Sequence, residues 1–234
     1  MHVLGVIPAR GGSKAIPRKN LTLLAGKPLL AYTCELAREA KTLTRIILST
    51  DDEAIAAYGR RLHVEVPFLR PKALAADETP MLDVLEHAVK TLREQEGYQA
   101  DIVVLLQPTS PLRKGEDIDR AVRLLKRHRA DSVVSVVEVP HQFNPVSLLK
   151  VQSGSLVPFL NGPLVLRRQD KPALYARNGP AVLAVWRRVL EEQRSLYGDV
   201  CLPFVMPPER SVDIDTPFDL ALAEFLLRRG RDGD

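Results

Sequence analysis

The stretch Ile7-Pro8-Ala9-Arg10-Gly11-Gly12-Ser13-Lys14-Ala15-Ile16-Pro17-Arg18-Lys19-Asn20 decides how the rest of the chain is organised. It follows an apolar run from Val3 to Ile7, which is typical of a buried strand, and it precedes residues 28–40, whose apolar spacing predicts a helix. A strand, a loop and a helix in this order place the loop at the carboxyl end of a first strand. That edge of an α/β sheet is where ligands bind.

The composition of this loop favours an anionic ligand. Gly11 and Gly12 omit the side chains that would keep a phosphate away from backbone N–H groups. From Met1 to Cys34 the sequence has five Lys and Arg residues and no Asp or Glu. The loop is neither a Walker A sequence nor a G-x-G-x-x-G fingerprint. We therefore expect a polyphosphate-binding loop of another type, the alternative being a solvated basic turn. The cationic side chains of the loop are Arg10, Lys14, Arg18 and Lys19.

Further strands and helices alternate along the chain. Strands are predicted at 45–50, 64–67, 102–107 and 131–139, and helices at 51–59, from Thr79 onward and at 115–128. The last two helices would bury apolar stripes made of Leu85, Ala88, Val89 and Leu92, and of Ile118, Ala121, Val122 and Leu125. Because the run at 102–107 is apolar throughout, it should be a central strand covered on both faces. The pattern indicates an α/β fold with a mainly parallel sheet, in a single domain spanning residues 1–234.

The regular alternation stops at residues 140–180, where Pro, Gly, Gln and Asn are frequent and strand patterns are weak. We expect this segment to be an excursion from the sheet, because a loop of this length is uncommon inside a compact domain. Arg167, Tyr175 and Arg177 lie near its end. Arginines around a tyrosine suit an anionic sugar, since guanidinium binds carboxylate in a bidentate manner. The alternative is a polar rim on a subunit interface.

Two acids near the end of the chain form a candidate metal site. In an extended segment, side chains two residues apart share a face, so Asp213 and Asp215 should project together while Val212 and Ile214 face the core. Adjacent carboxylates repel each other unless a cation lies between them, and oxygen ligands near a phosphate suit Mg²⁺. The alternative is that Asp215 only precedes a helix, which starts at Thr216-Pro217 and carries Phe218, Ala221, Leu222, Phe225 and Leu226 on one face.

Composition excludes several classes of protein. The 234 residues have a net charge of +4 and a pI near 9.1, but aromatics make up only 5%, so a nucleic-acid partner is not expected. Apolar runs are too short for a membrane span or a signal peptide, and we expect a cytoplasmic protein without a membrane partner. Cys34 and Cys201 show no metal-binding or disulfide spacing.

Four blocks of the sequence resemble the acylneuraminate (CMP-sialic acid) cytidylyltransferases, which activate sugars with a nucleotide. The blocks are Ala9–Asn20, Arg70–Asp77, Leu106–Arg113 and Val212–Asp219, in the order that the family has them. The first block departs from the family wording only at Ala15, where the family usually has Gly. His141, Asn144 and Pro145 also fit a family phrase, although His141 is assigned no chemistry.

The resemblance implies a three-layer Rossmann-like nucleotidyltransferase fold with a small arm at 140–180 that forms a homodimer. It implies transfer from CTP to a nine-carbon acidic sugar, giving CMP-sugar and pyrophosphate with Mg²⁺ as cofactor. The nucleotide would contact Ala9, Arg10, Gly11, Gly12, Ser13, Lys14, Lys19, Asn20 and Arg70. Catalysis would depend on Arg10, Lys19, Asp213 and Asp215, of which Asp213 and Asp215 would bind the metal. The sugar would contact Gln107, Arg167, Tyr175 and Arg177.

Some alternatives stay open at the level of sequence. Arg70 could be a surface residue before a proline, and the acid substrate could be a legionaminic, pseudaminic or Kdo sugar, or the nucleotide GTP. Kdo-activating relatives carry a metal-binding acid in the third block, which this chain lacks, and the family's aromatic residue after Asn178-Gly179 is also missing. A non-catalytic nucleotide-binding subunit is a further alternative. The presence of all four expected catalytic residues argues against it.

Overall fold

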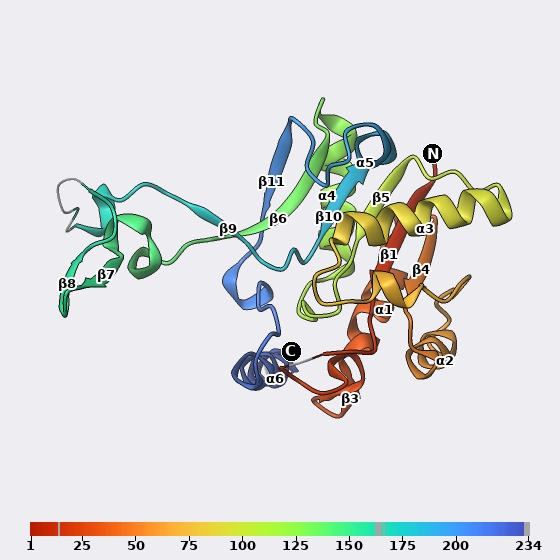
Figure 1. The fold of residues 1–234 in the computed structure, drawn as a ribbon, viewed down its shortest axis with the longest axis horizontal. Coiled ribbons are helices and arrows are strands. Elements are labelled where there is room, and N and C mark those ends of the chain that lie inside the picture. Colours follow the sequence, from red (N-terminus) through yellow and green to blue (C-terminus); the bar gives the residue numbers. More distant parts are fainter. Residues whose placement is uncertain (14, 162–164, 166, 232–234) are drawn as a thin grey trace.

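The computed structural model describes residues 1–13, 15–161, 165 and 167–231. In this part of the chain, seven strands form one sheet (Figure 1). Six follow the order β11-β6-β10-β5-β1-β4, and β9 pairs with β6. Their bounds are β1 Val3–Pro8, β4 Arg45–Ser49, β5 Ile102–Leu105, β6 Ser132–Glu138, β9 Tyr175–Arg177, β10 Leu183–Trp186 and β11 Cys201–Val205.

Helices cover both faces of the sheet and make the three-layer fold that the resemblance implied. One core cluster joins one face of the sheet to α1 (Leu29–Glu39), α2 (Glu53–Arg61) and α4 (Gly115–Arg127). A second cluster joins the opposite face to α3 (Met81–Glu96) and α5 (Arg187–Glu192). In β5, Ile102 and Val104 contact the first cluster, while Val103 and Leu105 contact the second. This period of two buries β5 on both sides, as its unbroken apolar run predicted.

Strand directions agree with a mainly parallel sheet, with two exceptions. β1 runs parallel to β4 and to β5, and β11 runs parallel to β6. β10 is antiparallel to both of its neighbours, and β9 is antiparallel to β6. The predicted strand at 64–67 is wrong. This segment meets β4 at one isolated bridge, Ile47 with Glu65, and the next bridge, Thr50 with Leu69, lies beyond Pro67, which has no N–H to extend a ladder.

A third core cluster attaches the last helix, α6 (Pro217–Arg231), beneath the first loop. It contains Ile16, Leu24, Leu29, Tyr32, Ile214 and Ala223. The start of α6 was predicted, but the expected apolar face points to solvent: Phe218 is 75% exposed and Phe225 is 59% exposed. The buried face instead carries Ala223 and the partly buried Leu220 and Leu227. A short hairpin of β2 (Leu23–Leu24) and β3 (Lys27–Pro28) lies beside α6.

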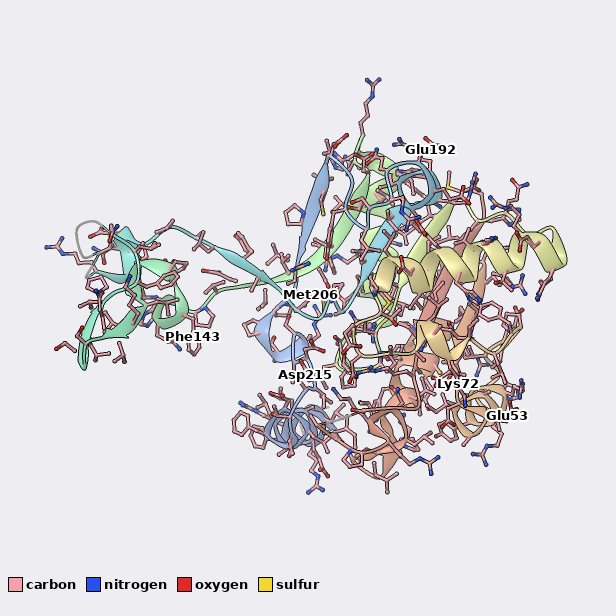
Figure 2. All side chains as sticks on the ribbon, in the orientation of Figure 1. Glu53, Lys72, Phe143, Glu192, Met206 and Asp215 are labelled. Atoms are coloured by element: carbon pink, nitrogen blue, oxygen red, sulfur yellow. The ribbon has the colours of Figure 1, made fainter. Side chains whose placement is uncertain are left out.

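The described residues from 140 to 174 leave the body of the molecule as an arm, as Figure 1 shows, whereas 175–180 return to it, since β9 pairs with β6 and Asn178 is buried. The arm carries a small hairpin, β7 (Leu149–Gln152) and β8 (Ser155–Pro158), and returns through β9. Phe143 in the arm lies far to one side of the sheet in Figure 2. Short 3-10 helices span Lys19–Leu21, Lys72–Leu74, His141–Phe143, Pro145–Ser147, Arg168–Asp170 and Pro208–Arg210. No helix in the described part of the chain is long and apolar enough to cross a membrane.

Candidate active site

A cavity of about 270 Å³ opens where β1 and β5 end. Pro8, the last residue of β1, and Gln107, which follows β5, both line it. The parallel strands β1 and β5 are neighbours, so their carboxyl ends meet at this edge of the sheet. The first loop therefore lies beside the loop that follows β5, and the cavity between them is the candidate site. The other polar residues that line this cavity include Arg10, Ser13, Lys19, Asn20, Arg70, Asp77, Thr79 and Asp215.

The first loop presents two cations to the cavity, and each has a carboxylate partner. Arg10 forms an ion pair with Asp77, which lies in the loop between α2 and α3. Lys19 forms an ion pair of 3.0 Å with Asp215. Asn20 donates from Nδ2 to the Arg10 carbonyl at 2.9 Å and so holds the loop closed on itself. The loop is thus an ordered arrangement of donors rather than a solvated basic turn.

Acids surround this loop in space, although none occurs near it in sequence. The N–H of Gly11 donates to Asp51 Oδ1 at 2.9 Å, and a Cβ at Gly11 would lie 2.8 Å from Asp52 Oδ2. Gly11 is therefore required by the close approach of the turn after β4. The expectation that Gly11 offers a free N–H is wrong for this conformation. Gly12 has no atom of a described residue within 4 Å of the position of a Cβ.

Arg70 is a buried cation that lines the first cavity. The residue is 5% exposed, and its Nε has no hydrogen-bond partner among the described residues. The nearest carboxylate in an ion pair, that of Asp51, is 4.0 Å from Nη2. Burial lowers the pKa of Arg70, and the Asp51 charge opposes that change. A buried guanidinium with an unused donor is poised for an acceptor supplied by a ligand, because an unsatisfied buried donor is costly.

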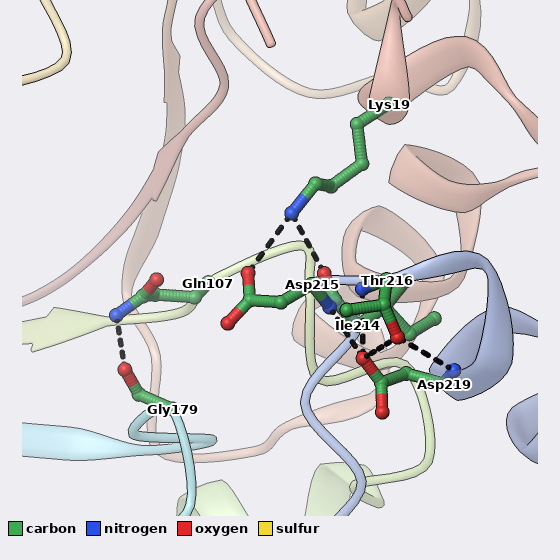
Figure 3. A network of polar contacts seen from close by, with 7 residues as sticks. All are labelled: Lys19, Gln107, Gly179, Ile214, Asp215, Thr216 and Asp219. Atoms are coloured by element: carbon green, nitrogen blue, oxygen red, sulfur yellow. Dashed lines mark hydrogen bonds and ion pairs between the residues drawn. The ribbon is translucent and has the colours of Figure 1, made fainter. Parts of the chain in front are cut away.

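Lys19 connects the first loop to the acidic segment near the end of the chain, as Figure 3 shows. Its Nζ donates to the Ile214 carbonyl at 2.8 Å as well as pairing with Asp215. Thr216 and Asp219 then cap α6 reciprocally, since Thr216 N donates to Asp219 Oδ2 at 2.7 Å and Asp219 N donates to Thr216 Oγ1 at 3.3 Å. A hydrogen bond from the Thr216 hydroxyl at 2.7 Å, with the backbone N–H groups of Thr216 and Asp215, lowers the pKa of the Asp219 carboxyl. The cap and the lysine together fix the position of Asp215.

Asp213 occupies a more enclosed position than Asp215. Its Oδ1 is buried without a hydrogen-bond partner in the described part of the chain, whereas the side chain of Asp215 is 73% exposed. Burial is the main reason that the pKa of Asp213 is raised, with the Asp215 charge adding to the effect and a hydrogen bond from Thr109 opposing it. Asp215 lines the first cavity, whereas Asp213 does not.

A second cavity, of about 430 Å³, adjoins the first and contains Asp213. Gln107 and Met81 line both cavities, so the two are continuous at these side chains. In the second cavity Arg177 donates from Nη1 to the Tyr197 hydroxyl at 2.6 Å. The first cavity therefore has Arg10, Lys19 and Arg70 with Asp77 and Asp215, and the second has Arg177 with Asp213. The arrangement can bind two ligands next to each other.

The structure brings most of the predicted site residues together, and Gly11, whose N–H is bonded to Asp51, is one of five exceptions. Ala9 is buried, and its N–H donates to the Ser49 carbonyl rather than facing the cavity. Arg167 and Tyr175 are exposed on the arm and on β9 and line neither cavity. Lys14 lies outside the described residues. The sugar-binding role predicted for Arg167 and Tyr175 thus lacks a geometric basis within one chain.

Three lining residues were missed by sequence reasoning. Asp77 ends the second block, so the block itself was a signal, but its pairing with Arg10 depends on the path of the loop. Thr109 lies inside the third block and lines the first cavity. Tyr197 follows α5 in a loop that carries no motif, and no signal in the sequence could have found it.

The acidic segment suits a divalent cation that prefers oxygen ligands. Asp213 has an unpartnered buried oxygen and Asp215 lies two residues away with its carboxylate directed at the first cavity, which is the donor set that Mg²⁺ prefers. Among the described residues, no group of three or more His, Cys, Asp or Glu side chains could hold a metal ion without further ligands. A metal here would need ligands from a bound phosphate or from water, as Mg²⁺ commonly does.

Comparisons with known proteins agree with this geometry. The sequence model of a family described as cytidylyltransferase matches residues 4–196. CMP-N,N'-diacetyllegionaminic acid synthase of Legionella pneumophila is 36% identical over 97% of both chains. N-acylneuraminate cytidylyltransferase of Escherichia coli is 30% identical over 94% of this chain and 51% of its own length. A solved CMP:2-keto-3-deoxy-manno-octonic acid synthetase complexed with CTP superimposes with a TM-score of 0.72 at 18% identity, over 98% of this chain and 100% of that one, which confirms the fold.

Replacing Asp213 by Asn should stabilise the empty protein at neutral pH. Because the folded-state pKa of this carboxyl is raised, the folded protein holds the proton more tightly than the unfolded chain, so its contribution to stability is lost as pH rises above the ordinary value of about 4. Asn carries no such charge. In urea unfolding, the gap between Asp213→Asn and the natural protein should widen from pH 5 to pH 8 in favour of the variant. Lower stability of Asp213→Asn at pH 8 would contradict this assignment.

Proposed function

The chain belongs to the cytidylyltransferase family, and we propose that this nucleotidyltransferase activates a nine-carbon acidic sugar of the sialic-acid type with CTP. The products are the CMP-sugar and pyrophosphate, and the reaction depends on Mg²⁺. The observation that carries the proposal is the pair of adjoining cavities that share Gln107, one lined by Arg10, Lys19 and Arg70 and the other by Arg177. Two anionic substrates need two cationic subsites in contact.

The first cavity has the properties required of the nucleotide subsite. Arg10 and Lys19 would exchange their carboxylate partners for the triphosphate, with Ser13 and Lys14 assisting. Arg70 would supply its unused Nε–H to an acceptor on the base or ribose. Charge-assisted hydrogen bonds of this kind are roughly twice as strong as neutral ones, so three cations suit a ligand with several negative charges.

The second cavity suits the sugar. Arg177 provides a guanidinium for a carboxylate, and its bond to Tyr197 holds that guanidinium in place. Gln107, at the junction, would orient the sugar hydroxyl that attacks the α-phosphate. Such a reaction needs no covalent intermediate, because in-line positioning and stabilisation of the equatorial charge are sufficient. Bound Mg²⁺, held by Asp213 and Asp215, would neutralise the charge that develops on the phosphate.

A diacetyllegionaminic acid is a second candidate for the sugar. The relative named for that substrate matches 97% of this chain and 97% of its own length at 36% identity. The relatives named N-acylneuraminate cytidylyltransferase reach 30–34% identity, and this chain spans about half of their length. The two candidates share the carboxylate and differ in their substituents, so both fit one guanidinium subsite.

Release of pyrophosphate tests the proposal. The natural protein should release pyrophosphate from CTP with a nine-carbon acidic sugar in Mg²⁺, and little from ATP, GTP or UTP or in EDTA. A panel containing sialic, legionaminic and pseudaminic acids and Kdo identifies the sugar by comparison of kcat/KM. Absence of pyrophosphate release with CTP and every acid would refute the proposed function. Full activity in EDTA would refute only the metal.

We also propose that the arm forms a homodimer. Large apolar side chains on it are exposed in the single chain, and a surface of this kind marks an interaction site. They are Phe143, Leu149, Val151, Leu156, Phe159 and Leu160. Val165 of the arm is partly buried, and Leu164 lies outside the described residues. In a dimer, the exposed Arg167 and Tyr175 would reach the site of the partner subunit.

Sedimentation should show a dimer for the natural protein and a monomer with low activity for Val151→Asp, since a buried charge opposes association. Phe225→Asp is the matched control, because Phe225 is an equally exposed apolar residue on α6 rather than on the arm. It should leave the dimer intact. A monomeric natural protein, or a monomer produced by Phe225→Asp alone, would contradict the arm as the interface.

A further inference from the structure

Arg113 is a fully enclosed arginine that the proposed reaction does not use. The residue is 1% exposed and lies at the end of the loop that follows β5. Its Nε donates to the Ser110 carbonyl at 3.1 Å, and its Nη2 donates to Thr33 Oγ1 at 2.8 Å. The guanidinium also donates to the carbonyls of Gln107 and Ala181. One side chain thus joins α1, the loop after β5 and the turn that precedes β10.

The charge of Arg113 is not neutralised by a direct partner. Among the described residues, no carboxylate forms an ion pair with it, and its hydrogen bonds all go to neutral oxygens. Burial lowers the pKa of Arg113 to about 9, while the more distant charges of Asp213 and Asp117 oppose that change. A core position whose only task is packing would be filled at lower cost by an apolar side chain, because an enclosed guanidinium loses its hydration. The planar fork with its several donors is what an apolar residue could not supply.

Two of the segments that Arg113 joins, the loop after β5 and the turn before β10, line the second cavity, and the loop after β5 also lines the first. The carbonyl of Gln107 accepts from the guanidinium, and the side chain of Gln107 donates to the Gly179 carbonyl at 2.7 Å (Figure 3). Ala181, which also accepts from Arg113, lies two residues beyond Gly179 in the same turn. The gap between loop and turn is narrow, since a Cβ at Gly179 would lie 2.7 Å from Ser110 Oγ.

The acidic segment is attached to the same loop. Ile214 N donates to the Thr109 carbonyl at 2.8 Å, and Asp213 directly precedes Ile214. Thr109 lies between Gln107 and Ser110, whose carbonyls both accept from Arg113. A shift of the guanidinium would therefore move Gln107, Gly179 and Asp213 together. The first loop, with Arg10 and Lys19, has no hydrogen bond to Arg113 among the described contacts.

We propose that Arg113 is a positioning residue for the acidic-sugar half of the site, which sets the separation between Gln107 and the turn at Gly179. The proposal rests on the proposed function for the identity of the ligand. It follows that loss of the guanidinium fork impairs the sugar subsite more than the nucleotide subsite, because the cations of the nucleotide subsite lie on other segments. A residue that only stabilised the fold would impair both subsites equally or neither.

The test is Arg113→Lys, which keeps the charge and loses the fork. With the sugar that the panel identifies, KM for the sugar should rise and kcat should fall, by roughly 10- to 100-fold together in kcat/KM for the sugar. The dissociation constant of CTP, measured by calorimetry without sugar, should stay within about twofold of the natural value. Arg187→Lys is the matched control, because Arg187 also donates to a carbonyl, that of Ala100 at 2.9 Å, at the opposite end of β5. It should alter Tm without changing KM for the sugar.

The outcomes separate the two claims. If the natural protein releases no pyrophosphate with any acid, the proposed function fails and the role of Arg113 fails with it. If the natural protein is active but Arg113→Lys alters Tm alone, or weakens CTP and sugar equally, only the role of Arg113 is overturned. Should Arg113→Lys not fold, Thr33→Val decides, since it removes one acceptor and keeps the guanidinium. It should raise KM for the sugar about two- to fivefold, and an unchanged KM would overturn the proposal.

Discussion

The bond between Lys19 and the Ile214–Asp215 segment is the contact on which the site depends. It joins residues 195 positions apart and brings the acidic segment against the first loop. The side chain of Lys19 is only 12% exposed, so the bond to the Ile214 carbonyl is shielded from water and is stronger than a surface contact. Ile214 also enters the third core cluster, beneath the loop. One lysine therefore couples the packing of α6 to the assembly of the candidate active site.

Electrostatic balance explains why so many charges can converge there without a ligand. Arg10 and Lys19 are held by Asp77 and Asp215, and Asp51 accepts from the Gly11 N–H. These carboxylates act as counter-ions that a triphosphate would displace, since it offers more negative charge at the same positions. Arg70 and Asp213 differ, because each keeps one buried polar atom without a partner in the described part of the chain. Such atoms mark the positions where a ligand adds bonds rather than exchanging them.

Sequence patterns predicted which segments form strands and helices better than they predicted what those strands and helices pack against. The alternation in β1 and β5 is local, so the central strands followed from the side chains alone. Residues 64–67 failed because Pro67 interrupts a ladder that only the neighbouring strand could reveal, and β10 was missed because antiparallel pairing depends on the return of the arm. The exposed face of α6 was misjudged because apolar residues occur on two faces, and only the third core cluster shows which one packs. No acid lies near the first loop in the sequence, but acids from other segments lie beside it in the fold.

The central claim is that the first loop and its neighbours bind a triphosphate. Calorimetric titration of CTP and of pyrophosphate into the natural protein, Arg10→Lys and Arg18→Lys tests it most directly. Arg10 lines the cavity, while Arg18 is an exposed cation of the same loop that does not line it. Loss of the bidentate fork at Arg10 should weaken both ligands by roughly 10- to 100-fold, and Arg18→Lys should bind them like the natural protein. Equal binding by all three proteins would contradict the claim.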